Sequence, residues 1–263
     1  MNNRLLLLIA SVLFFTSCTM HEEIDLAKEG NGFYQVHVDM SPMMEMMKGM
    51  GGSNAVPDSI AKEVRDTTFS LASMIDSAGG NFTAEEKAYF YKATMQMKMD
   101  MPSSKMEVFM KFPVKNAADL RKLFAVWSKV DSLNEIKKKQ KEEAALNQPP
   151  KVPTIGSGSP VDNITNPGEL PFKPSPYIIT DTSIQRTSLS KEDIMNDMGE
   201  TGQGVLMAAS QKNYTTTIKL ARPVKKLTGK NVKLSDDKRT VFYSASLQEL
   251  LDDPTAGEFL IIY

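Results

Sequence analysis

The chain has 263 residues, of which 41% are hydrophobic, and its 31 Lys and Arg residues nearly balance 32 Asp and Glu residues. The apolar content is sufficient for a packed core, and a net charge of -1 excludes a general electrostatic attraction to nucleic acid or acidic lipid. A single cysteine excludes an internal disulfide.

The first predicted element is an export signal. Arg4 precedes an apolar run over residues 5–15, and Thr16 and Ser17 then lead to Cys18. An apolar run of this length beside a cation is typical of a secretory signal peptide, and it is shorter than the roughly 20 residues that a spanning helix needs. We therefore expect residues 1–17 to be a signal peptide outside the fold.

The cysteine closes the sequence FFTSC, which resembles the lipobox of bacterial lipoproteins in the relaxed form used by Bacteroidota. Phe15 stands where Leu is usual, and Ser17 stands where Gly or Ala is usual. The resemblance implies that Cys18 is lipidated and anchors the protein at the outer membrane, on its periplasmic face or at the cell surface. Residues 18–22 are then a lipidated tether. Their sequence also resembles the acidic leader of surface-exported lipoproteins, and a solvated tether explains it equally well.

A single domain is predicted over residues 23–263, and it begins with a β-hairpin. Apolar and polar residues alternate up to Val38 on either side of a Gly30-Asn31-Gly32 turn, whose residue types supply the positive φ of tight hairpins. A methionine-rich stretch over residues 43–50 predicts a short helix. Apolar residues near helical spacing predict a further helix over residues 57–78.

The sequence MQMKMDM begins a second predicted hairpin. Methionine occupies every second position before a Pro102-Ser103-Ser104 turn, and Val108 and Phe112 alternate with further methionines after it. Successive side chains of a strand point to opposite faces, so one face of this hairpin is rich in methionine. The residues in question are Met95, Met97, Met99, Met101, Met106 and Met110.

Three interpretations of the methionine face remain open. Methionine fills irregular gaps in an ordinary core, and the same adaptability suits a pocket for an acyl chain or another apolar ligand. Thioether sulfur also selects Cu(I), although residues two apart on a strand are about 6.7 Å apart and no histidine is interleaved with them. The six methionines are therefore candidate ligand-binding residues, and no metal site is assigned to them.

A long amphipathic helix is predicted to follow, with Asn116 as its N-cap and an apolar stripe that ends near Ile136. Eight prolines then fall within residues 147–176, and repeated proline prevents regular strand pairing. We expect residues 147–175 to form an extended, exposed insert.

The C-terminal part of the chain alternates again. Strands are predicted over residues 177–185, 213–221, 239–246 and 258–263, and short helices over residues 191–199 and 247–254. An apolar final strand would expose hydrophobic side chains if it frayed into water, so we expect it to join the sheet and to give both halves one core. The predicted fold class is α+β, with an antiparallel sheet built from N-terminal hairpins and C-terminal strands and with helices packed on one face.

Residues 18–45 and 225–263 together resemble uncharacterised Bacteroidota lipoproteins, and they are more distantly similar to LppM-type envelope lipoproteins. The features that carry the resemblance are the early Gly-Asn-Gly hairpin and the sequence NVKLSDDKRTVFYSASLQELLDDP. The resemblance implies an α+β domain associated with lipid binding, and it transfers no functional residue. Four triplets also resemble the O-glycosylation signal of exported Bacteroidota proteins, and they begin at Asp58, Asp66, Asp76 and Asp131.

No catalytic constellation is found in the sequence. Its two histidines are His21, in the predicted tether, and His37, on the polar side of a strand, and no nucleophile elbow, HExxH or phosphate loop is present. We therefore expect a protein without catalytic residues or a cofactor, which contacts the membrane through its anchor and binds a lipid or other hydrophobic ligand. A structural or adhesive surface protein and a Cu(I)-binding protein are the alternatives, and the sequence does not determine the oligomeric state.

Overall fold

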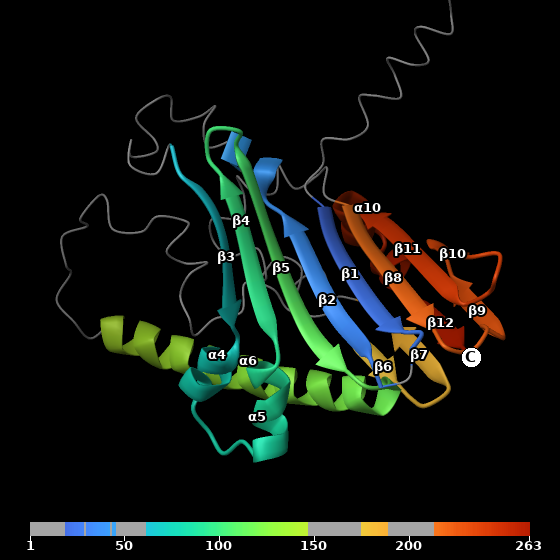
Figure 1. Ribbon diagram of the computed structural model, residues 1–263, viewed down its shortest axis with the longest axis horizontal. Helices are drawn as coiled ribbons and strands as arrows, with labels where there is room; N and C mark the ends of the chain where they lie inside the picture. The colour runs from blue at the N-terminus through green and yellow to red at the C-terminus, as the bar shows by residue number, and fades with distance from the viewer. Residues whose placement is uncertain (1–18, 29, 43, 46–61, 147–174, 189–212) are drawn as a thin grey trace, which may run out of the picture.

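The computed structural model describes residues 19–28, 30–42, 44–45, 62–146, 175–188 and 213–263. Within these residues the protein has the predicted α+β fold, with an eight-stranded sheet and a smaller four-stranded sheet (Figure 1). The signal peptide, Cys18, the helix over residues 191–199, and nearly all of the insert and of the helix over residues 43–50 lie outside the described residues.

The large sheet combines strands from both halves of the chain. Each neighbouring pair is antiparallel except β1 and β8, which are parallel, so the sheet is mixed where the sequence predicted an antiparallel one. A parallel pair requires a crossover connection, and here most of the chain separates the two strands. In spatial order the strands are β10 (Val232–Leu234), β11 (Thr240–Ser246), β8 (Asn213–Leu220), β1 (Thr19–Leu26), β2 (Gly32–Asp39), β5 (Lys105–Val114), β4 (Thr94–Asp100) and β3 (Val64–Ser70).

The small sheet contains the last strand of the chain. Its spatial order is β6 (Tyr177–Ile179), β7 (Ser183–Arg186), β12 (Phe259–Ile262) and β9 (Lys226–Gly229). The strand predicted over residues 177–185 is a hairpin, in which the Thr180 amide donates to the Ser183 carbonyl at 2.9 Å. The final apolar run is a strand, as predicted, but it joins this second sheet rather than the large one.

The hairpins predicted around residues 30–32 and 102–104 are both present as β1–β2 and β4–β5. Gly30 has the positive φ that the turn requires (80°), whereas Asn31 does not. Gly32 has a different role, because a Cβ there would lie 2.4 Å from the carbonyl oxygen of Asp25 on the neighbouring strand.

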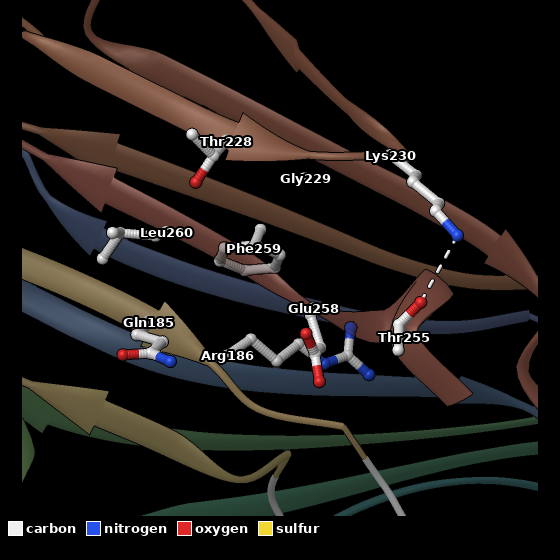
Figure 2. Close-up of a pocket in the computed structure, with 9 residues that line it drawn as sticks. All are labelled: Gln185, Arg186, Thr228, Gly229, Lys230, Thr255, Glu258, Phe259 and Leu260. Carbon is white, nitrogen blue, oxygen red and sulfur yellow. Dashed lines mark hydrogen bonds between the residues drawn. The ribbon is translucent and has the colours of Figure 1, made fainter. Parts of the chain in front are cut away.

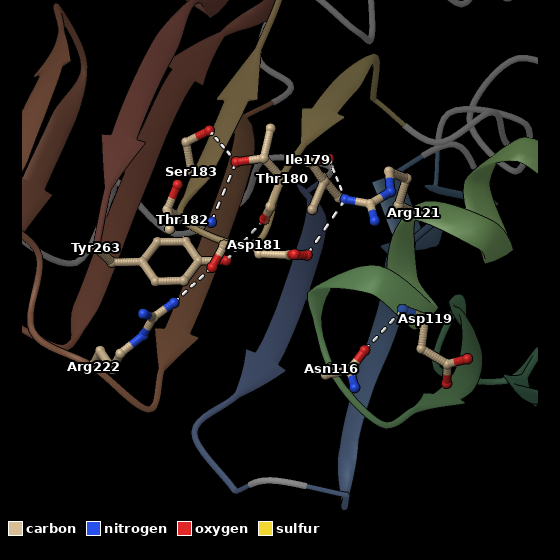
Figure 3. Close-up of polar contacts among 10 residues, drawn as sticks. All are labelled: Asn116, Asp119, Arg121, Ile179, Thr180, Asp181, Thr182, Ser183, Arg222 and Tyr263. Carbon is tan, nitrogen blue, oxygen red and sulfur yellow. Dashed lines mark hydrogen bonds and ion pairs between the residues drawn. The ribbon is translucent and has the colours of Figure 1, made fainter.

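The described helices are α4 (Ala72–Ala78), α5 (Ala84–Tyr91), α6 (Ala117–Leu146), α10 (Leu247–Asp252) and the 3-10 turn η2 (Pro254–Gly257). The long helix was predicted correctly, including its cap, since the Asn116 side chain accepts from the Asp119 amide at 2.9 Å (Figure 3). Helix α5 was not predicted, although Thr83 and Glu86 form a complete capping box before it.

The helix predicted over residues 57–78 is wrong for its central part. Residues Val64–Ser70 form β3, which pairs with β4 along its whole length, and among the described residues 62–78 only Ala72–Ala78 are helical. The strand contains β-branched and aromatic residues such as Val64, Thr67 and Phe69, which favour extended structure. The approximate helical spacing of the apolar residues arose because two different elements follow each other.

One hydrophobic core joins the two halves, as predicted. The buried cluster includes residues of both sheets and of the helices, and all of them lie on one face of the large sheet. Trp127 of α6 is at its centre, with its ring centroid 4.7 Å from that of Phe112 in β5. Arg121 connects the first turns of α6 to β6 of the small sheet through a hydrogen bond, in which its Nη1 donates to the Ile179 carbonyl at 3.1 Å (Figure 3).

Candidate functional site

The structure gathers most of the predicted ligand-binding methionines into a second buried group. This methionine cluster consists of Met44, Met97, Met99, Met101, Met106 and Val108. Met40 and Met95 pack against it with partly buried side chains. Met110, by contrast, belongs to the main core, so the hairpin face is divided between two clusters.

The methionine cluster receives no residue from α4, α5 or α6. These helices pack against the same face of the sheet further along the strands, where Met110 and Phe112 join the main core. Figure 1 shows α6 crossing the strands near one end of the sheet, while β5 begins at the other end. The cluster therefore lies at the end of the sheet that is distant from α4, α5 and α6.

Cross-strand pairing brings methionine side chains close together. Met99 of β4 lies directly opposite Met106 of β5, and Met95 lies opposite Met110. Residues opposite each other in an antiparallel pair have Cβ atoms roughly 4.5–5.5 Å apart, which is closer than residues two apart on one strand. This pairing between strands is what makes the cluster compact.

A second site was not predicted, and it is built around a buried carboxylate. Glu22 is 2% exposed, although the sequence assigned residues 18–22 to a tether. That assignment is wrong for residues 19–22, which lie in β1. Pairing with β2 on one side and β8 on the other makes β1 an interior strand, so its alternate side chains enter the core.

Glu22 accepts four hydrogen bonds from neutral donors. The hydroxyl of Tyr34 donates to Oε1 at 2.8 Å, and the hydroxyl of Tyr177 donates to Oε2 at 2.9 Å. The amide and the hydroxyl of Ser175 donate at 3.1 and 2.7 Å. We call Glu22, Tyr34, Ser175 and Tyr177 the Glu22 centre. Ser175, the last residue of the predicted exposed insert, is therefore buried.

The electrostatics of the Glu22 centre keep its phenols neutral. Burial, reinforced by the nearby carboxylate, holds the pKa values of Tyr34 and Tyr177 well above their usual value. Arg186 of β7, which is also 2% exposed, lies with its guanidinium 4.6 Å from the ring centroid of Tyr243. The centre is thus a set of fixed hydrogen-bond donors around one carboxylate, with a buried cation nearby.

Sequence alternation contained a signal for these residues. Glu22 is two residues before the buried Ile24 and four before the buried Leu26, so all three lie on one face of β1. Arg186 is likewise two residues after the buried Ile184 of β7. Extending the predicted strand towards the N-terminus would have placed Glu22 on the core face. Its partners Ser175 and Tyr177 could not be found in this way, because about 150 residues separate them from Glu22.

The two histidines lie on the opposite face of the large sheet. His21 of β1 is directly opposite His37 of β2. The His37 ring stacks on Phe109 with centroids 4.1 Å apart, and its Nε2 is 3.2 Å from a carboxylate oxygen of Glu107. Nδ1 of His21 forms a hydrogen bond of 2.8 Å with the Thr215 hydroxyl, and burial lowers the pKa of His21 below its usual value. Both rings therefore have protein partners.

The glycosylation-like triplets fall on three different elements. The triplet at Asp66 lies in β3, the triplet at Asp76 in α4 and the triplet at Asp131 in α6, while that at Asp58 is outside the described residues. Ser77 and Ser132 are exposed, and each donates its hydroxyl proton to a carbonyl of its own helix.

Two kinds of feature are absent from the described residues. No helix there has both the length and the apolar character needed to cross a membrane. No group of three or more His, Cys, Asp or Glu side chains in the same part of the chain is arranged to hold a metal ion.

No family model matches the chain, and no curated protein or solved structure is significantly similar to it.

Proposed function

We propose that the protein is a lipid-anchored lipoprotein of a bacterial outer membrane that binds an acyl chain or a similar apolar ligand at the methionine cluster. It acts by binding rather than by catalysis. The observation that carries the proposal is a buried cluster made almost wholly of methionine, to which α4, α5 and α6 contribute no residue. The main core, in contrast, is built from aromatic and branched side chains with few methionines.

The side chain of methionine explains why such a cluster suits a ligand. It is unbranched, has three rotatable bonds and carries a polarizable sulfur, so it can repack around a guest of variable shape. Leucine, isoleucine and phenylalanine specify a single packing more strongly. A cluster of five methionines and one valine is therefore easier to open than the core around Trp127.

Strand register supports a membrane source for the ligand. Met20 lies opposite Val38, Val38 opposite Val108, and Val108 opposite Met97. Adjacent strands are about 4.8 Å apart, so roughly 14 Å separates Met20 from Met97 across the sheet. Cys18 is two residues before Met20 in the sequence. An acyl anchor on Cys18 would keep the methionine end of the sheet close to the bilayer.

The anchor is tested by metabolic labelling. Cells of a Bacteroidota host that express the full chain and are grown with radiolabelled palmitate should incorporate label into the protein. The Cys18→Ser variant should incorporate none, because the chain has no other cysteine. Equal labelling of the two proteins, or no labelling of the wild type, would contradict the lipoprotein assignment.

The ligand is tested by titrating the purified protein with cis-parinaric acid, whose fluorescence rises in an apolar site. The variant Met97→Gln places an unpaired amide in the methionine cluster, at a cost of about 1–3 kcal/mol, so binding should weaken about 5- to 150-fold. Met74→Gln is the matched control. Met74 is also 4% exposed but belongs to the main core, so this variant should lose stability and keep its affinity.

Equal weakening by both substitutions would mean that the loss comes from general destabilisation, and it would contradict a site at the cluster. The same titration can distinguish the copper alternative. The copper alternative would be supported if the protein does not bind parinaric acid but competes with bicinchoninate for Cu(I), and if the Met97→Gln variant competes less well.

A further inference from the structure

The small sheet has a cavity of about 390 Å³ at one end, away from the methionine cluster. Residues of β7, β9, β12 and η2 line it, and Figure 2 shows the side chains of Arg186, Lys230, Thr255 and Glu258 gathered around it. Its volume lies near the lower limit of pockets that hold small molecules, about 300–1,000 Å³. The cavity is therefore of a size for one small ligand.

The notable residue of the lining is Arg186. Its side chain is buried, yet Nε and Nη1 of its guanidinium have no hydrogen-bond partner. Its guanidinium lies over the π face of Tyr243, and the Glu22 carboxylate acts on its charge through space. Buried charges in folded proteins are normally paired and hydrogen-bonded, because an unpaired one is costly. An arginine in this state at a cavity wall indicates that an anion completes it.

The buried carboxylate of Glu22 does not fill this role. Its oxygens already accept four hydrogen bonds from Tyr34, Tyr177 and Ser175. Among the described residues no ion pair includes Arg186. Glu22 lowers the cost of the buried cation through space but leaves its donors unused, so the guanidinium keeps the capacity to bind an oxyanion.

A second cation stands beside the cavity. Lys230 is exposed, and its ammonium donates to Asp253 at 2.5 Å and to the Thr255 hydroxyl at 3.4 Å (Figure 2). The opposing charge is Glu258, whose carboxylate lies on the same side as the Arg186 guanidinium in Figure 2. Gln185 and Thr228 add an amide and a hydroxyl to the lining, which suit the hydroxyl groups of a polar ligand.

We propose that this cavity binds a small hydroxylated organic anion, such as an acidic sugar, with its carboxylate or phosphate group on Arg186 and within reach of Lys230. The site is independent of the acyl-binding function proposed above, because it lies on the other sheet and shares no residue with the methionine cluster.

Isothermal titration calorimetry of the purified protein at low salt tests the proposal with three probes: glucuronate, glucose 6-phosphate and glucose. One or both acids should bind saturably with a stoichiometry of one, and glucose should not. A preference between the two acids distinguishes a carboxylate ligand from a phosphate ligand. Absence of saturable binding by either acid, or equal binding of glucose, would overturn the proposal.

Paired lysine variants show whether binding occurs at this cavity. Lys230→Met should weaken binding of the acid about three- to five-fold, as expected for loss of one exposed charge partner. Lys226→Met is the control, because Lys226 is an exposed lysine at the start of β9, the strand that ends directly before Lys230, and it does not line the cavity. Equal effects of the two variants would indicate diffuse electrostatics and would overturn the proposal.

Substitution of Arg186 can prevent folding, so the decisive variant is one that should improve binding. Glu258→Gln removes a negative charge at the edge of the cavity and should tighten binding of the acid about three-fold or more. Misfolding cannot produce such a gain. A Glu258→Gln protein with unchanged or weaker affinity for the acid would overturn the assignment of the anion to Arg186.

Discussion

Replacing Glu22 by alanine is expected to lower the free energy of unfolding by at least about 3 kcal/mol, the loss typical when one partner of a buried charged group is removed. The substitution leaves four buried donors without their acceptor, namely the hydroxyls of Tyr34 and Tyr177 and the amide and hydroxyl of Ser175. It also removes a negative charge that stabilises the buried Arg186 cation. Urea denaturation followed by circular dichroism measures the change.

The adjacent residue provides a matched control. Glu23 occupies the next position of β1 and faces the other side of the sheet, where it accepts from Lys219 at 2.6 Å. Partly exposed ion pairs of this kind contribute about 0–1 kcal/mol, so Glu23→Ala should cost no more than that. Similar losses in the two variants would contradict a buried Glu22 centre. They would agree instead with a flexible tether over residues 18–22.

A glutamine at position 22 separates hydrogen bonding from charge. Its side-chain carbonyl oxygen can still accept from the Ser175 amide, and the hydroxyl groups of Tyr177 and Ser175 can rotate to accept from its NH₂ group. Glu22→Gln should therefore cost less than Glu22→Ala. Whatever cost remains reports the loss of the carboxylate charge near Arg186.

Replacing Trp127 by alanine is the second substitution with a large expected effect, a loss of about 3–5 kcal/mol. The indole is 1% exposed and contacts the rings of Phe112 and Tyr34, with centroid distances of 4.7 and 6.0 Å. Its removal leaves a cavity where α6 packs on the large sheet. Because Trp127 is the only tryptophan, the unfolding curve is followed by circular dichroism rather than fluorescence.

Two further variants define what the tryptophan contributes. The indole Nε1 has no hydrogen-bond partner, so Trp127→Phe loses packing area without losing a bond and should cost less than the alanine variant. Ile136 of the same helix is 52% exposed, and Ile136→Ala should change stability by no more than about 0.5 kcal/mol. A loss below about 1 kcal/mol for Trp127→Ala would contradict the packing of α6 on the sheet.

Local sequence patterns predicted the elements whose signals are contained within a few residues. Period-two alternation on both sides of a turn identified the β1–β2 and β4–β5 hairpins, and the spacing of apolar residues after Asn116 identified α6. The same local reasoning failed over residues 64–70, which form β3 although they lie directly before α4 within one stretch of plausible helical spacing. There the pairing of β3 with β4 outweighed the local pattern.

The candidate sites divide in the same way. Alternation placed the six methionines on one face of a hairpin, and five of them are buried, with Met95 partly so. Alternation did not show that Met110 belongs to the main core while Met106 belongs to a separate cluster. That division depends on how much of the sheet face α4, α5 and α6 cover. The sequence of the hairpin itself does not specify this coverage.

By itself the sequence determined the α+β class, the two hairpins, the long helix and the methionine-rich face, because each depends on residues that are neighbours in the chain. Only the tertiary structure decided that Glu22 is buried, that the last strand joins a second sheet and that Arg186 lines a cavity. The hydrogen bonds to Glu22 span up to 155 residues. Contacts of that range form only when the strands have assembled, since loop closure must be offset by the whole core at once.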